Sequence, residues 1–250
     1  MKKILIIHGW MHSSDRYTML KSDMEKMLEC RVDLYEIPGF GKTKPTCYFN
    51  LLHYYSSLVR DVIAENEYDY VIGHSMGGNI LLRVLDMVDT KSKLILLSPA
   101  YMGISYLKPL TIFCPIMPLG LLILQKIDCK FTTFLMKLIA LLTVNKWKQI
   151  DDRIIKDSRR ANALIATVTM FELAWDSWRI TSGLWKERKV NLVVGQNDRI
   201  ILDNKMQLLR RDLYCCKLHV IAGIGHTAVV EAYDELLKII CTIINTGDDE

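Results

Sequence analysis

The stretch Tyr70-Val71-Ile72-Gly73-His74-Ser75-Met76-Gly77-Gly78 decides the fold. Its first three residues are apolar and predict a buried strand, and a helical pattern over 79–88 follows the glycines. The pattern G-x-S-x-G stands between the two. A serine on so sharp a turn projects its hydroxyl above the sheet, and the residues two before and two after it crowd the neighbouring backbone, where glycine fits.

Short apolar runs alternate with helical patterns on both sides of this stretch. Further helices are predicted at 16–29, 51–65 and 227–244, and strands at 4–7, 32–37, 70–72, 94–97, 192–194 and 218–221. Alternating strands and helices predict an α/β fold whose central sheet is mostly parallel and flanked by helices. Strands buried on both faces are continuously apolar, as these are.

The alternation stops after residue 100. The pattern from about 101 to about 185 is helical without a convincing strand, and strands resume after 186. We therefore expect a core built from 1–100 and 186–250, with 101–185 inserted as a helical cap, or lid. The polar tail at 246–250 is expected to fray.

Composition excludes several classes of protein. Half of the 250 residues are hydrophobic and 24% are charged, which is typical of a folded chain and not of a disordered one. Net charge is +4, from 32 basic and 28 acidic residues, too balanced for a dedicated nucleic-acid binder. The seven cysteines are scattered without a CxxC pair, so neither a zinc site nor a disulfide framework is expected. Reduced thiols indicate a cytoplasmic protein.

Targeting and membrane-spanning segments are not expected. The apolar run at 4–7 is too short for a signal peptide. The uncharged stretch 109–125 is slightly short for a transmembrane helix and contains Pro109, Pro115, Pro118 and Gly120.

Four motifs in chain order resemble the α/β-hydrolase superfamily, within it the small esterase, lipase and C–C hydrolase group with a helical cap. They are His8-Gly9-Trp10, Gly73–Gly77, Gly195-Gln196-Asn197-Asp198 and Gly225-His226. The resemblance covers the whole chain outside the cap. The first motif and Pro38-Gly39-Phe40-Gly41 are also similar to methyl esterases that act on pimeloyl carrier protein.

A serine hydroxyl needs a base within hydrogen-bond reach, and the base needs an acid that orients it. The order in the family is serine, acid, histidine, and only His219 and His226 follow Ser75. His219 lies within a predicted strand, whereas His226 follows one on a glycine-containing loop, so we expect His226 to be the base. Asp198 follows the strand at 192–194, at the end where catalytic groups gather in such sheets, and is the expected acid; an ordinary turn or cap aspartate is the alternative.

The backbone N–H of Met76, at the start of a helix, is expected to donate to an oxyanion. The resemblance implies the backbone N–H of Trp10 as the second donor. The side chains of Trp10, His74 and Met76 are expected to contact substrate; the alternative for Trp10 is a buried aromatic residue.

The cap carries most of the positive charge. Residues 101–175 contain ten Lys and Arg against five Asp and Glu, beside apolar stretches at 119–124 and 131–142. An apolar lid indicates a hydrophobic pocket. A basic rim would attract an acidic carrier protein or an anionic membrane surface. The alternative is that apolar residues pack the lid onto the sheet while the basic residues face solvent.

The sequence thus predicts a serine hydrolase that cleaves small-molecule carboxylic esters of apolar acyl groups through an acyl-enzyme, with no metal or organic cofactor. Three activities on the same residues remain open: acyl thioesterase or acyltransferase on CoA or carrier-protein substrates, and C–C bond hydrolase. A ligand sensor on a hydrolase scaffold, or a membrane-surface protein anchored by the cap, is the alternative from a different class. Dehalogenases and epoxide hydrolases are disfavoured, because those relatives have an aspartate where Ser75 stands.

Overall fold

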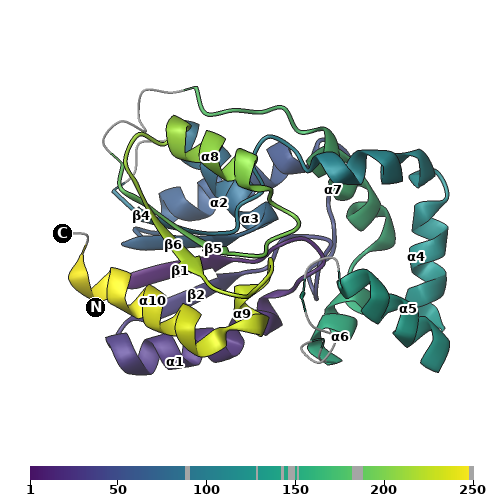
Figure 1. The fold of residues 1–250 in the computed structure, drawn as a ribbon, viewed down its shortest axis with the longest axis horizontal. Helices are drawn as coiled ribbons and strands as arrows, with labels where there is room; N and C mark the ends of the chain where they lie inside the picture. Colours follow the sequence, from purple (N-terminus) through teal and green to yellow (C-terminus); the bar gives the residue numbers. More distant parts are fainter. Residues whose placement is uncertain are drawn as a thin grey trace.

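Six parallel strands form one sheet in the order β2-β1-β3-β4-β5-β6 (Figure 1). The structure is a computed structural model and describes residues 1–87, 91–127, 129–141, 144–145, 150, 152–181 and 188–247. The strands are β1 (Lys3–Ile7), β2 (Arg31–Tyr35), β3 (Tyr70–His74), β4 (Lys93–Leu97), β5 (Val190–Gly195) and β6 (Cys216–Ile221). The predicted α/β class with a parallel central sheet is confirmed.

Helices cover both faces of the sheet, because alternate residues of each strand point to opposite faces. Leu5 and Ile7 belong to a core shared with α2 (Leu51–Glu65), α3 (Met76–Met87) and α8 (Asp203–Asp212). Ile4 and Ile6 belong to a second core, against α1 (Thr18–Leu28) and α10 (Tyr233–Thr246) on the other face (Figure 1). The continuous apolar runs of the inner strands β1, β3 and β4 follow from this two-sided burial.

Several elements differ from the sequence expectation. A 3-10 turn, η1 (Ser14–Tyr17), precedes α1, and the closing helix is divided into α9 (Ala228–Glu231) and α10. Helix α8 was not predicted, since only Met206 and Leu209 of its ten residues are buried and its apolar pattern is weak. Helix α3 begins at Met76, directly after the serine, and the predicted end of that helix at 88 lies outside the described residues.

The described residues between β4 and β5 form helices and no strand. They are η2 (Ser105–Phe113), α4 (Met117–Lys126), α5 (Lys130–Ala140), α6 (Asp152–Arg160) and α7 (Ala163–Trp175). We propose that these helices are the predicted cap. Its predicted boundary at 185 and 186 falls on a segment outside the described residues.

Carboxylates on α6 and α7 join the inserted helices to the core. Asp157 on α6 accepts hydrogen bonds from the Ser13 hydroxyl at 2.6 Å and from Nη2 of Arg16 at 2.6 Å. Both side chains of the Arg16–Asp157 ion pair are almost fully buried. Glu172 on α7 accepts the backbone N–H groups of Leu51 and Leu52, each at 2.8 Å, and so satisfies the first donors of α2. Helices α6 and α7 are therefore fixed against the sheet domain.

The outermost inserted helix is packed differently. None of the residues of α4 is buried, although its sequence is strongly apolar. No single described helix is long and apolar enough to cross a membrane; the pair at 107–113 and 117–126 passes that test only together, with an 88° bend between the two helices.

Candidate active site

Ser75 occupies the turn between β3 and α3. Its φ is +51°, in the left-handed region that L-residues other than glycine rarely adopt. The turn is held from both sides, because its N–H donates to the carbonyl of Leu97 at 2.9 Å and its carbonyl accepts the N–H of Ala100 at 3.0 Å. The serine therefore lies on a sharp turn between a strand and a helix, the position that G-x-S-x-G predicts.

The two glycines of G-x-S-x-G are required by the approach of neighbouring backbone. A Cβ atom on Gly77 would lie 2.5 Å from the carbonyl oxygen of Ile7 and 2.6 Å from that of His8. A Cβ atom on Gly73 would lie 2.8 Å from the carbonyl oxygen of Gly77. All three distances are far below van der Waals contact. A side chain at Gly77 would push the serine turn away from β1, and one at Gly73 would displace the backbone of the turn itself.

Asp198 and His226, the predicted acid and base, meet at the carboxyl ends of the strands. Oδ2 of Asp198 lies 2.8 Å from Nδ1 of His226, and both side chains are 5% exposed. Gly195 permits this contact, since a Cβ atom there would lie 2.0 Å from the carbonyl oxygen of Gly225. The loops after β5 and β6 therefore pass each other directly, with the acid on one and the histidine on the other.

The carboxylate of Asp198 is held in its ionised form. Burial alone would raise its pKa, but the charge and hydrogen bond of His226, the N–H of Ile201 and the hydroxyl of Ser98 together lower the pKa below its usual value. Oδ1 of Asp198 accepts the N–H groups of Ile200 at 2.8 Å and Ile201 at 3.0 Å. This leaves Oδ2 oriented toward His226.

Glu231 on α9 organises the loop that carries His226, and sequence reasoning missed it. Its carboxylate accepts the N–H of Gly225 at 3.1 Å and the N–H of Thr227 at 3.4 Å, on either side of the histidine. It also accepts the N–H of Asn145 from the inserted segment at 2.9 Å. A glutamate five residues after a loop histidine gives no recognisable motif, so only the folded backbone reveals this role.

His74, next to Ser75, contacts the histidine loop through its ring. Nε2 of His74 lies 3.2 Å from the carbonyl oxygen of His226, and because a carbonyl can only accept, Nε2 carries the hydrogen. The ring of His12 stacks on that of His74 with centroids 5.2 Å apart. Burial, followed by the charge of His226, lowers the pKa of His74 to about 3, so the ring is neutral at ordinary pH.

The loop after β1 passes beside Ser75. A Cβ atom on Gly9 would lie 3.2 Å from Cβ of Ser75. His8 fixes this loop, because its Nε2 accepts the N–H of Ile37 at 3.0 Å while Nδ1 donates to the carbonyl of Gly9 at 2.8 Å. The half-buried Trp10 donates its indole N–H to the carbonyl of Ala166 on α7 at 3.0 Å, so its side chain also contacts the inserted helices.

Met76 is the first residue of α3, and its side chain is fully buried in the core. As the first N–H of a helix, its backbone donor has no partner within the helix and shares in the positive end of the helix dipole. His219, the alternative histidine, lies on β6 at the edge of the sheet, with Nε2 3.0 Å from Oδ1 of Asn191.

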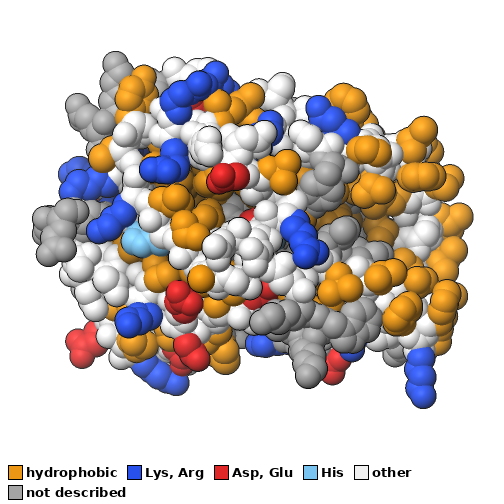
Figure 2. Space-filling model, in the orientation of Figure 1, with side chains coloured by type: hydrophobic (Ala, Val, Ile, Leu, Met, Phe, Trp, Pro, Cys, Tyr) orange, Lys and Arg blue, Asp and Glu red, His pale blue; other side chains and the backbone are white. Residues whose placement is uncertain are grey.

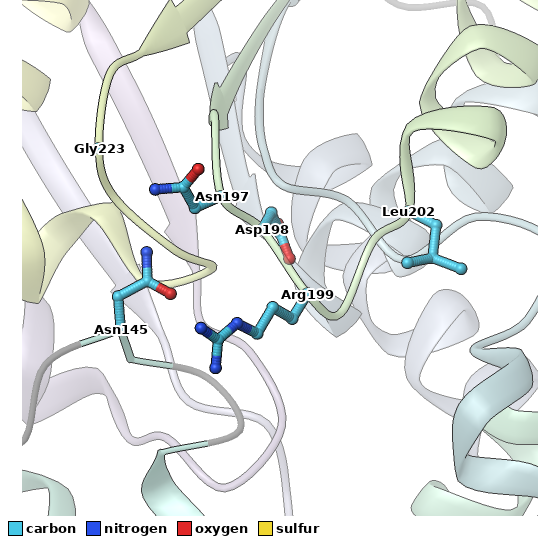
Figure 3. A pocket seen from close by; sticks show the side chains of 6 residues that line it. All are labelled: Asn145, Asn197, Asp198, Arg199, Leu202 and Gly223. Atoms are coloured by element: carbon cyan, nitrogen blue, oxygen red, sulfur yellow. The ribbon is translucent and has the colours of Figure 1, made fainter.

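An open pocket of about 670 Å³ borders the site on the Asp198 side. The side chains of Asn145, Asn197 and Arg199 point into it, and Leu202 and Gly223 complete its walls (Figure 3). Ser75 and His226 are not among its lining residues, so it flanks the Asp198–His226 pair and does not lie over the serine.

Among the described residues, no three His, Cys, Asp or Glu side chains are arranged to hold a metal ion. All seven cysteines are free thiols, and Cys215 and Cys216 lie at the start of β6, away from the site.

Residues 4–239 match the family model described as the alpha/beta hydrolase family. The chain belongs to this family. An esterase from Exiguobacterium antarcticum has a similar structure with a TM-score of 0.76 and 16% identity, over 98% of this chain and 92% of that one. The 2-hydroxy-6-oxo-6-phenylhexa-2,4-dienoate hydrolase of Rhodococcus sp. strain RHA1 is similar with a TM-score of 0.73 and 16% identity, over 98% of this chain and 90% of that one. A thermophilic esterase from Thermogutta terrifontis has a TM-score of 0.72 and 17% identity, over 98% of this chain and 90% of that one. At these identities the likeness shows a shared fold.

The close approach at Gly77 predicts a severe effect of a single methyl group. We expect Gly77→Ala to lower the free energy of unfolding by at least about 2 kcal/mol, as overpacking against backbone does. Gly120→Ala is the matched control, since a Cβ there meets nothing within 4 Å and alanine favours a helix. Urea unfolding of the two variants measures the difference. Equal stability of Gly77→Ala and wild type would show that the turn tolerates a side chain.

The low pKa of His74 predicts a loss of stability in acid. The unfolded chain protonates this ring below its ordinary pKa of 6.5, whereas the folded state keeps it neutral down to about 3. Stability is thus fully present above 6.5 and falls as the pH drops through that window, by about 1.4 kcal/mol per pH unit from this one ring. His8 and His12, whose pKa values burial also lowers, add slopes of the same sign.

Urea unfolding between pH 6.5 and pH 4 measures this slope. In His74→Gln, the free energy of unfolding should depend on pH less steeply than in wild type, by about 1.4 kcal/mol per pH unit. His53→Gln, on the exposed side of α2, should keep the wild-type slope. Parallel curves for wild type and His74→Gln would contradict the neutral buried ring.

Proposed function

We propose that the protein is a serine hydrolase that cleaves carboxylic esters of apolar acyl groups, with Ser75 as nucleophile, His226 as base and Asp198 as orienting acid. The observation that carries the proposal is the buried 2.8 Å contact between Nδ1 of His226 and Oδ2 of Asp198. Its place near the serine is supported by the carbonyl oxygen of His226, which lies 3.2 Å from Nε2 of His74, the residue before Ser75 on the strand–helix turn. A carboxylate can only accept, so Nδ1 carries the hydrogen and Nε2 is left as the basic nitrogen.

In the first half of the proposed reaction, Nε2 of His226 takes the proton of the Ser75 hydroxyl while Oγ bonds to the acyl carbon. The carbonyl electron pair moves onto oxygen and then returns, which breaks the bond to the alcohol oxygen. The alcohol leaves with the proton from His226. In the second half, water gives its proton to His226 and attacks the acyl carbon, and the acid departs as Ser75 regains its proton.

We assign the oxyanion hole to the backbone N–H groups of Met76 and Trp10. Support comes from the position of Met76 at the start of α3 and from the loop at Gly9, which passes within contact of Ser75. The reaction needs no metal or organic cofactor, because the oxyanion is stabilised by these donors and the proton moves through His226.

Of the three side chains predicted to contact substrate, Trp10 is half-buried, whereas His74 and Met76 are buried. We assign the acyl contact first to the indole of Trp10, which is joined to α7, and we place His74 and Met76 in the wall behind the serine. An apolar acyl group is expected, because α7, which the indole contacts, is apolar.

Replacing the nucleophile is the sharpest activity test. We expect Ser75→Ala to lower kcat/KM on p-nitrophenyl esters by at least about 10³-fold, as the loss of a triad member does. Ser57→Ala, whose hydroxyl bonds to the His53 carbonyl within α2, is the matched control and should keep wild-type turnover. Full activity of a folded Ser75→Ala variant would reject the serine mechanism.

A series of esters with two to twelve carbons, run beside matching acyl-CoA thioesters, separates the alternatives. Faster turnover of thioesters would indicate a thioesterase or acyltransferase. The four lysines of η2, α4 and α5 support this alternative, because they could bind an acidic carrier protein or CoA. Turnover of neither class by folded wild type would favour a C–C bond substrate or a ligand sensor.

A further inference from the structure

The end of the molecule formed by η2, α4 and α5 exposes large hydrophobic side chains. Figure 2 shows them gathered at this end, opposite the chain termini of Figure 1. We call six of them, all between 47% and 77% exposed, the apolar end face: Ile112, Ile116, Leu119, Ile123, Phe131 and Phe134. Single exposed apolar residues are ordinary, but a contiguous group of this size marks a surface that contacts something apolar.

The side chains of this face repeat at helical spacing. Ile116, Leu119 and Ile123 are three and then four residues apart, which places them on one side of α4. Phe131 and Phe134 repeat in the same way on α5. A helix in a globular protein normally turns such a stripe toward the core, yet no residue of α4 is buried. The stripe therefore faces outward.

The charged side chains on η2, α4 and α5 are all positive. They are Lys108, Lys126, Lys130 and Lys137. Lys108, Lys126 and Lys130 are exposed, and Lys137 is half-buried on α5. Nζ of Lys108 lies 4.8 Å from the centroid of the half-exposed ring of Trp175 on α7. An apolar face with a basic rim and an aromatic residue at its border is complementary to an anionic lipid surface.

The backbone has a shape suited to the plane of an interface. Residues 107–113 and 117–126 meet at 88°, so the two segments form a bent, apolar edge. A bent pair of short helices can place its apolar side chains at the boundary between headgroups and acyl chains while the lysines remain at the headgroups.

We propose that the apolar end face docks the protein onto an anionic membrane surface. The apolar side chains enter the boundary of the acyl chains, and Lys108, Lys126, Lys130 and Lys137 bind lipid phosphates. A second copy of the chain would place lysines against lysines across a symmetric contact, and an acidic protein would pair with the lysines without covering so much apolar surface. The proposal depends on this surface alone and does not require the proposed ester chemistry.

Vesicle co-sedimentation tests the proposal on the whole protein. Wild type should bind vesicles of phosphatidylcholine mixed with phosphatidylglycerol, bind vesicles of phosphatidylcholine alone much more weakly, and be released from the mixed vesicles by added salt. Leu119→Glu combined with Phe131→Glu should abolish binding. Each change of Lys126 or Lys130 to Gln should weaken it about fivefold, the effect of one basic residue near such a surface.

Matched controls lie on α1, at the far side of the sheet. Met27 is 58% exposed and Lys26 is its exposed neighbour, so Met27→Glu and Lys26→Gln should bind as wild type does. Circular dichroism establishes that each variant is folded. The comparison of the two vesicle types uses wild type alone, so it tests docking even if a variant fails to fold. Ser75→Ala should also bind normally, so failure of the proposed hydrolase chemistry and failure of docking are distinguishable.

Several results would overturn docking. Binding to both vesicle types at the same strength would show that anionic lipid is not what the protein recognises. Loss of binding in the α1 controls would show that docking is not a property of the apolar end face. A dimer by sedimentation velocity that Leu119→Glu dissociates, with no vesicle binding by the monomer, would assign the face to a second copy. Binding of an acidic carrier protein without vesicle binding would assign it to that class of partner.

Discussion

The backbone at Ser75 adopts a φ of +51°, and the rest of the site depends on the contacts that hold it there. Such a conformation is costly for a residue with a side chain and persists only where its surroundings enforce it. Here the close passage of β1 along Gly77, together with the hydrogen bonds to Leu97 and Ala100, fixes the turn. The same contacts bring the loop at Gly9 within reach of the serine.

A second set of close backbone approaches positions Asp198 and His226. Gly195 allows the loops after β5 and β6 to cross, and Glu231 then binds the N–H groups on both sides of His226. Glu231 also binds Asn145 of the inserted segment, so the histidine loop and the insertion share one carboxylate. The buried Arg16–Asp157 pair forms a further connection between core and insertion. The position of the insertion is thereby coupled to the position of His226.

The sheet could be predicted from the sequence, and so could the positions of Ser75, Asp198 and His226 after the carboxyl ends of its strands. Both depend on apolar periodicity and glycine placement, which are local signals. Sequence reasoning did not predict α8, whose few buried residues leave little apolar pattern. The helical pattern after the serine was evident only from residue 79, although the N–H of Met76 was expected at a helix start, where the structure has it. The roles of Glu231, His12 and Asp157 arise from contacts between residues distant in the chain. The outward direction of the α4 stripe also required the structure, since the same pattern is typical of a helix that packs on a core.

Covalent labelling tests whether Ser75 is a nucleophile that His226 activates. Wild type would be incubated with a fluorophosphonate, whose phosphorus bonds to an activated serine oxygen as fluoride leaves, and the modified residue would be located by mass spectrometry. We expect one adduct, on Oγ of Ser75, whose rate of formation falls steeply in His226→Ala. An unmodified Ser75 in folded wild type, or labelling of His226→Ala at the wild-type rate, would contradict it.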